Sequence, residues 1–240
     1  MGPLITPDWP APTHVKSLMT TRAGGVSVAP YASLNLGAHV QDDPHAVAEN
    51  RRRLRGILPA EPVWLNQIHG TQIIQADTAS GVPDADASFT RIPNTVCAVL
   101  TADCLPVLFC ARDGSAVAAA HAGWRGLAAG VLEATVAAMQ VPPGEVIAWL
   151  GAAIGPDAFE VGTEVRDTFI ASHPSAASAF KSHQQKWLAD IYTLARIRLN
   201  VCGVRAIFGG GLCTYTDAAR FYSYRRDGVT GRMATLVWID

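Results

Sequence analysis

The sequence has almost no net charge and no long basic segment. Its formal net charge is −1, and its longest run of Lys or Arg is the triplet Arg51-Arg52-Arg53. This triplet falls in a helical pattern and is most simply a solvated helix face. Nucleic acid is therefore not an expected partner.

Long apolar runs are also missing. None approaches the roughly 20 residues that a membrane-spanning helix requires, and the N-terminal MGPLITPDWPAP has no basic stretch followed by an apolar core. Hydrophobic residues still make up 49% of the chain, against 16% charged residues, which is enough for a substantial core. We expect a soluble cytoplasmic protein with no membrane partner.

Cysteine is scarce and unpaired. The five cysteines, at positions 97, 104, 110, 202 and 213, are odd in number and include no Cys-x-x-Cys pair. This argues against a disulfide framework and favours a reducing compartment. Most of the thiols are expected to behave as small buried hydrophobes. Cys104 has a context that could make it different.

No repeat, low-complexity tract or linker divides the chain, so residues 1–240 are expected to form one domain. Strands are predicted within 14–22, 63–76 (two), 95–123 (three), 145–155, 204–210 and 233–239, and helices at 44–56, 124–139, 162–172 and 185–200. The strands occur both as hairpins and in alternation with helices. This mixture predicts an α+β domain with mixed sheets rather than a doubly wound parallel fold.

The segment TADCLPVLFCARDGSAVAAAHAGWRG, residues 101–126, carries a cysteine and a histidine on either side of an Asp-Gly. Asp113-Gly114 is the preferred dipeptide of a two-residue hairpin turn, because both central positions need positive φ. Such a turn places His121 opposite Pro106, two residues from Cys104, and a slightly wider loop places it directly opposite Cys104. In either register the two side chains are near neighbours.

A lone cysteine in a strand and a lone histidine at a strand end are usually structural, but His69 adds a third group. It lies in a tight break, NQIHGT, and is followed by Gly. Two imidazoles and one thiolate suit Zn²⁺, with a fourth position left for water or substrate. The same donors also suit copper, so the spacing leaves the metal open.

Several blocks of the chain are similar to the signature blocks of one family. NQIHG, TADCLPVLF and HAGWRG resemble the YfiH-type family, also called laccase-domain or polyphenol oxidase proteins and described as bacterial purine nucleoside phosphorylases. The similarity continues in TTRAGGVS, YASLNLG, IGPDAFEVG and FYSYRRDGVTGRMATL, and so covers essentially the whole chain. One departure is Asp157, which stands where related sequences often carry Cys.

The resemblance implies that His69, Cys104 and His121 bind zinc or copper. It implies phosphorolysis of adenosine, inosine, guanosine and methylthioadenosine to the base and ribose 1-phosphate, with adenosine deamination as a side activity. The implied fold is a layered, CNF-like α/β sandwich, once grouped with cysteine hydrolases. Editing of peptidoglycan precursors is a separate role proposed for the family.

Histidine is too sparse for the older oxidase description. A four-copper oxidase needs paired His-x-His ligands, and the seven histidines here include no such pair. Multicopper oxidation is therefore rejected as the main function.

Phosphate is best held by Arg with help from backbone N–H groups in a glycine-bearing turn. One loop offers such a set: Arg22, Gly24, Gly25 and Ser27. Its alternative is an ordinary Gly-Gly turn with a surface arginine. Other candidates are Arg125, which is nearest the metal in sequence, and the C-terminal arginines Arg225, Arg226 and Arg232.

Four further residues are candidates for the site. Asn35 and His39 lie in the long loop 23–44 and could reach the sugar or base. Asp103 could orient a ligand imidazole or simply cap a turn. Trp124 could stack on a purine, although a core tryptophan at a helix start is the commoner case.

Three functions remain open from the sequence. The first is a zinc-dependent purine nucleoside phosphorylase whose partners are a nucleoside and phosphate. The second is a Cys–His hydrolase or amidase acting on a cell-wall precursor, with Cys104 as nucleophile and His121 as base. The third is a non-catalytic metal-binding or scaffold protein. The chain could act as a monomer or a homodimer.

Overall fold

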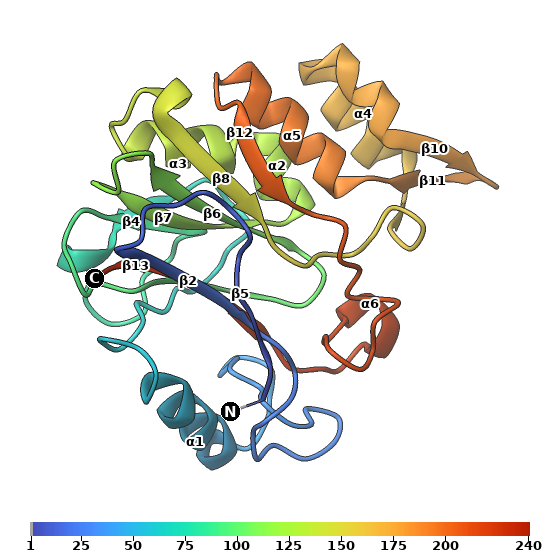
Figure 1. The fold of residues 1–240 in the computed structure, drawn as a ribbon. Coiled ribbons are helices and arrows are strands. Elements are labelled where there is room, and N and C mark those ends of the chain that lie inside the picture. The colour runs from blue at the N-terminus through green and yellow to red at the C-terminus, as the bar shows by residue number, and fades with distance from the viewer. Residues whose placement is uncertain (1) are drawn as a thin grey trace.

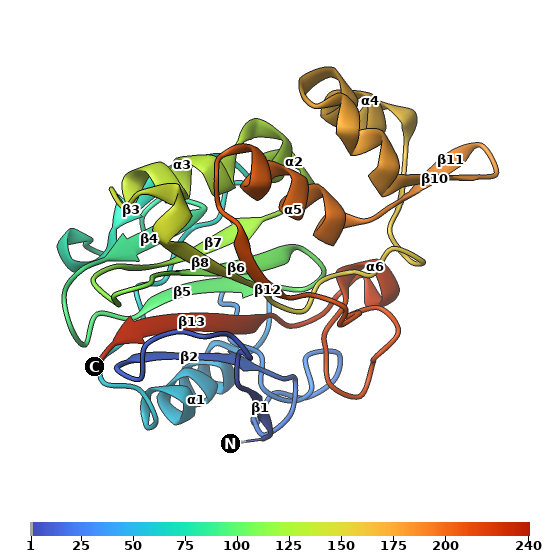
Figure 2. The same ribbon diagram turned by 45° about the horizontal axis from the view of Figure 1, so that its top comes forward.

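A computed structural model describes residues 2–240 (Figure 1). Two β-sheets stack face to face at its centre, and helices cover the outer face of each sheet (Figure 2). The mixed sheets and flanking helices confirm the predicted α+β class. In residues 2–240 we find no helix with the length and apolar character required to cross a bilayer.

One sheet has four strands, all antiparallel, in the order β1-β2-β13-β5. Their bounds are β1 Leu4–Ile5, β2 Val15–Thr20, β13 Met233–Ile239 and β5 Cys97–Thr101. The first and last parts of the chain therefore lie side by side in this sheet.

The second sheet has six strands in the order β12-β8-β6-β7-β4-β3, antiparallel in the middle and parallel at both edges. Their bounds are β12 Ala206–Gly209, β8 Val146–Leu150, β6 Leu105–Ala111, β7 Val117–Ala122, β4 Ala87–Thr90 and β3 Ile73–Gln75. Strands β6 and β7 are buried along their whole length. Their unbroken apolar sequences are what a sheet covered on both faces requires.

Alternate residues of the strands face different layers. Met19, Val99 and Leu108 lie between the two sheets. Phe109 and its neighbours face α2 (Trp124–Ala129), α3 (Val131–Ala138) and α5 (Ile191–Val201), and Leu236 faces the side covered by α1 (Pro44–Arg55). The result is a sandwich of four layers, helix, sheet, sheet and helix.

A small three-stranded sheet and a helix project from this sandwich (Figure 1). The sheet has the order β10-β11-β9, with β10 Phe180–His183, β11 Lys186–Ala189 and β9 Glu160–Val161, and it lies beside α4 (Thr163–Ser172). Short 3₁₀ helices occupy Ala76–Thr78, Pro143–Glu145 and Pro174–Ala179, and α6 covers Tyr224–Asp227.

Helix ends follow local signals in the sequence. Helix α1 begins after Asp43, whose carboxylate accepts a hydrogen bond from the His45 amide, and it ends at Gly56, as predicted. The predicted helix 124–139 is broken into two, because Gly130 takes φ of 103°. The predicted helix 185–200 starts only at Ile191, since the preceding residues pair as β11.

The predicted strand pairing around Asp113-Gly114 is confirmed, because Pro106 lies opposite His121. The turn itself is different. Only Gly114 has positive φ, and the first closed pair is Ala111 with Ala116, so four residues form the loop. The segment 63–76 contains one regular strand, β3, and only isolated bridges before it, rather than the two strands predicted.

Candidate metal centre and active site

Three donor side chains from three separate segments meet at one end of the six-stranded sheet. Cys104 lies in the turn between β5 and β6, His121 lies near the end of β7, and His69 lies in the loop before β3. Their donor atoms are all within 4.8 Å of one another, and Sγ of Cys104 is 4.0 Å from Nε2 of His69. His121 is buried, Cys104 half-buried and His69 exposed, so the group could hold a metal ion that a substrate can reach.

Asp86 fixes two of the three donors. Its fully buried carboxylate accepts hydrogen bonds from Nδ1 of His121 (2.8 Å) and from the backbone amides of His69 (3.0 Å) and Gly70 (2.6 Å). Because Nδ1 of His121 is taken by the carboxylate, its Nε2 is the nitrogen left for a ligand. A single carboxylate thus orients one imidazole and shapes the turn that carries the other.

Sequence reasoning missed Asp86 and offered Asp103 either for the corresponding role or as a turn cap. The carboxylate of Asp103 instead accepts hydrogen bonds from Oγ1 of Thr214 (2.6 Å) and the amide of Arg225 (2.7 Å). Asp103 therefore holds the segment that leads into α6, and it orients no imidazole. The signal that could have indicated Asp86 is its position immediately before β4, the strand that pairs with β7 and so lies beside His121.

Two glycines of HAGWRG make room for the donors. A Cβ at Gly123 would lie 2.9 Å from Cδ2 of His69 and 3.2 Å from Sγ of Cys104. A Cβ at Gly126 would lie 2.8 Å from the carbonyl oxygen of Gly70. Helix α2 can approach the donor turns this closely only because both positions lack a side chain.

The electrostatics favour an ion pair between Cys104 and His121. Burial acts to raise the pKa of the Cys104 thiol, but the adjacent His121 charge and hydrogen bonds outweigh it, and the pKa lies below its usual range. Burial acts to lower the pKa of His121, but the thiolate and Asp86 outweigh it and raise that pKa. Each partner thus stabilises the charged form of the other.

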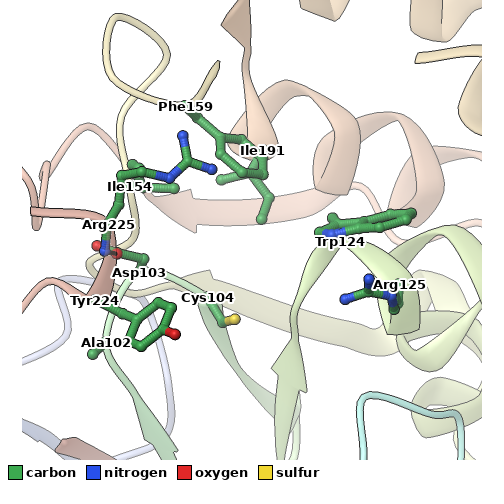
Figure 3. Close-up of a pocket in the computed structure, with 10 residues that line it drawn as sticks. All are labelled: Ala102, Asp103, Cys104, Trp124, Arg125, Ile154, Phe159, Ile191, Tyr224 and Arg225. Atoms are coloured by element: carbon green, nitrogen blue, oxygen red, sulfur yellow. Dashed lines mark hydrogen bonds between the residues drawn. The ribbon is translucent and has the colours of Figure 1, made fainter. Parts of the chain in front are cut away.

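Two cavities share Cys104 as part of their walls. The smaller, of about 250 Å³, lies between Tyr224 on one side of Cys104 and Trp124 on the other (Figure 3). Phe159 and Ile191 line its far end, where the guanidinium of Arg225 lies beside the Phe159 ring. The larger, of about 380 Å³, is lined by all three donors. Tyr224 lines both cavities.

The structure brings some of the other candidate residues to these cavities. Arg125, Arg225 and Trp124 line the smaller cavity, where Arg125 lies over the Trp124 ring and Arg225 over the Phe159 ring. His39 lines the larger cavity together with Arg232. Burial and nearby arginines lower the pKa of His39, which favours its neutral form.

The glycine loop near the N-terminus is not at either cavity. Arg22 donates to the carbonyls of Ala32 and Ala218, and the amides of Gly24 and Gly25 both donate to Oγ of Ser33. These contacts fit an ordinary structural turn.

Three more candidate residues are also used internally. Asn35 is fully buried and bonds to Gly37 and Asp42. Ser27 donates to Asp42. Arg226 donates to three backbone carbonyls and pairs with Asp227. The structure gives none of the three a free group facing Cys104.

The chain matches known proteins over nearly its whole length. A family described as multi-copper polyphenol oxidoreductase laccase matches residues 16–240. Proteins named purine nucleoside phosphorylase from Pseudomonas aeruginosa and Escherichia coli are 60% and 57% identical, each covering 100% of both chains.

Solved structures agree with these matches. A Neisseria meningitidis protein has a TM-score of 0.96 at 56% identity and covers 99% of each chain. YlmD from Geobacillus stearothermophilus has a TM-score of 0.89 at 32% identity and covers 95% of this chain and 92% of its own.

Proposed function

The chain belongs to the family described as multi-copper polyphenol oxidoreductase laccase, and from this premise we propose that it is a zinc-dependent purine nucleoside phosphorylase. Its substrates would be adenosine, inosine, guanosine and methylthioadenosine, with adenosine deamination as a side activity. The observation that carries the proposal is the meeting of His69, Cys104 and His121 at the wall of two cavities. The curated relatives named purine nucleoside phosphorylase support it.

The donor set suits zinc. Two imidazole nitrogens and a thiolate leave one coordination position open, which is typical of a catalytic zinc site. The hydrogen bond from His121 to Asp86 is the support that such ligands commonly have. The chemistry that zinc supplies when bound is Lewis-acid stabilisation of developing negative charge. Copper accepts the same donors and is the alternative metal.

In phosphorolysis the bond from ribose C1′ to the purine nitrogen breaks as a phosphate oxygen bonds to C1′. The apolar side chains of the smaller cavity, among them Phe159 and Ile191, provide a surface for a flat base. Trp124 and Tyr224 border the same space and could contact the base or the sugar. The cavity thus combines aromatic and aliphatic side chains with two arginines beside Cys104.

The direct test is to incubate the purified, zinc-loaded protein with adenosine or inosine, with and without phosphate. We expect equal amounts of base and ribose 1-phosphate that require phosphate, and a slower conversion of adenosine to inosine. Chromatography separates adenine from inosine, so the two reactions are scored independently. Failure to release base from any purine nucleoside contradicts the proposal.

A second candidate function rests on the row Cys104, His121 and Asp86. A thiol, an imidazole and a carboxylate in this order are the parts of a thiol hydrolase, in which His69 would orient or stabilise the substrate. A cell-wall precursor would then be the substrate. Metal content and thiol alkylation with and without chelator separate the two: protection by metal favours the phosphorylase, and equal alkylation favours the hydrolase.

Multicopper oxidation receives no support beyond the family description. Within residues 2–240 the group of His69, Cys104 and His121 is the sole cluster of three or more potential ligands. A four-copper centre needs several such groups. Cytoplasmic location, and action as a monomer or a homodimer, remain predictions.

A further inference from the structure

One arginine, Arg232, lines the larger cavity, and only one nitrogen of its guanidinium donates hydrogen bonds within the described residues. Nη1 of Arg232 donates to the carbonyls of Thr230 and Gly231 (both 3.0 Å). In the described part of the chain no carboxylate lies within 4.0 Å of it, unlike Arg198 and Arg226, which each pair with an acid. Nε and Nη2 are left to donate to a ligand.

Arg232 is also held in place before any ligand arrives. Its amide donates to Oδ1 of Asn35 (2.9 Å), and its aliphatic stem passes Gly37 so closely that a Cβ there would lie 2.8 Å from Cγ. Burial lowers the pKa of Arg232 from its usual range. A half-buried cation without a carboxylate is costly unless an anion approaches it. The arrangement therefore fits an anion site better than a structural ion pair.

Two neighbours add hydrogen-bonding capacity to the same cavity. His39 stands in its wall with an imidazole whose surroundings favour the neutral form, which still carries one N–H donor. Thr101 also lines it, and its buried hydroxyl has no hydrogen-bond partner within residues 2–240. An oxyanion with several acceptor oxygens can use all three groups.

From these contacts we propose that Arg232, with His39 and Thr101, binds inorganic phosphate on the β5 side of Cys104. The purine then occupies the smaller cavity on the other side, against Phe159 and Ile191. This assignment rests on the proposed phosphorylase function. It gives the two substrates separate cavities that meet at Cys104 and Tyr224, where the ribose C1′ must lie for the bond exchange.

The smaller cavity is the competing location for phosphate, because Arg125 and Arg225 line it. Both are exposed, whereas Arg232 is half-buried, and Nη1 of Arg225 donates to the Glu160 carbonyl. Phe159 and Ile191 line the same cavity and offer a surface for a flat base. We therefore place the base beside them, and the test includes both residues.

The test compares Arg232→Lys and Arg232→Gln with Arg125→Gln and Arg225→Gln in the zinc-loaded protein. Arg166→Gln, on the remote helix α4, controls for loss of one positive charge. KM for phosphate and KM for inosine are measured separately. We expect Arg232→Lys to raise KM for phosphate about 10- to 100-fold, as loss of charged hydrogen bonds predicts. KM for inosine should change by less than about threefold, since those bonds are made to phosphate alone.

Direct phosphate binding, measured by calorimetry without nucleoside, separates this inference from the proposed function. If phosphate binding depends on Arg232 but no nucleoside is cleaved, the subsite stands and the phosphorylase proposal fails. If nucleosides are cleaved and Arg232→Lys binds phosphate like the parent, the subsite is overturned. A larger rise in KM for phosphate in Arg125→Gln or Arg225→Gln also overturns it. Circular dichroism identifies a misfolded Arg232→Gln, in which case Arg232→Lys decides.

Discussion

Cys104 and Cys110 lie six residues apart and have opposite chemistry. Cys110 is inside β6, fully buried, and its thiol donates to a backbone carbonyl; burial, together with Asp113, raises its pKa to about 12. Cys104 lies just before the same strand, half-buried against two imidazoles, and its pKa falls. The difference shows that the end of the strand, and not the residue type, creates the reactive group.

The largest expected effect comes from removing the thiol of Cys104, which differs from that of Cys110 in its lowered pKa. Cys104→Ala should lose nearly all bound zinc and essentially all activity, because one of three protein ligands is gone. Metal analysis of the purified variant is the measurement.

Cys110→Ala is the matched control for that substitution. It should keep its zinc and lose about 1 kcal/mol of unfolding free energy through a small cavity. Full zinc occupancy in Cys104→Ala would end the case for the metal centre.

The next effect tests the support beneath the donors. Asp86→Asn keeps the shape of the side chain but removes the charge that holds His121 and the turn of His69. We expect zinc affinity to fall about 10- to 100-fold, the usual cost of losing a ligand's hydrogen-bond partner. Competition with a chromophoric chelator measures it.

Asp103→Asn is the comparison for Asp86→Asn, since Asp103 holds α6 rather than an imidazole. It should alter zinc affinity much less. Equal losses in the two variants would show that Asp86 has no special place at the site.

A third prediction concerns pH in the metal-free protein. Because the pKa of Cys104 is lowered, the thiolate is present at neutral pH, and its alkylation rate should level off near neutrality. An ordinary thiol, with a pKa of about 8.5, keeps accelerating to higher pH. At pH 7 we expect Cys104 to react about tenfold faster than a small free thiol.

Cys110 should stay unmodified in the same experiment until the protein unfolds, because it is buried and its pKa is raised. Mass spectrometry of peptides assigns each site. Steady acceleration of Cys104 up to pH 9 would contradict the ion pair with His121.

The smallest effect comes from a single added methyl group. Gly123→Ala should push His69 and Cys104 apart by a few tenths of an ångström and lower zinc affinity several-fold. Unfolding free energy should fall by about 1 kcal/mol, as is typical of mild overpacking. Gly144→Ala, where nothing lies within 4 Å of the added Cβ, should change neither quantity.

The sequence revealed those features whose signals are local. Asp43 and Gly56 mark the ends of α1, and Asp113-Gly114 predicts the hairpin that brings His121 near Cys104. His69 lies in the tight break NQIHGT, which is consistent with its position beside Cys104 and His121. The similarity to a family was nevertheless needed to select His69 as the third donor. Strand β4, whose partner β7 is distant in sequence, was missed, and so was β11, although it forms a local hairpin with β10.

Two errors have a common physical cause. The loop with Arg22, Gly24 and Gly25 contains the right donors for phosphate, but the acceptors that already use them lie in other segments of the chain. The carboxylate of Asp86 is important because it accepts hydrogen bonds from His121, His69 and Gly70, which lie in other segments of the chain. A sequence shows hydrogen-bonding groups, and only the fold shows which of them remain free.

The position of Asp103 limits how substrate preference can change. Its carboxylate accepts a hydrogen bond from the Arg225 amide in α6, and its backbone is joined directly to Cys104, so this cavity wall is coupled to the position of the sulfur. Displacing the wall to admit a larger ligand would also shift the sulfur of Cys104. We therefore expect the shape of both cavities to change more readily by exchanging protruding side chains, Tyr224 first among them, than by moving the main chain.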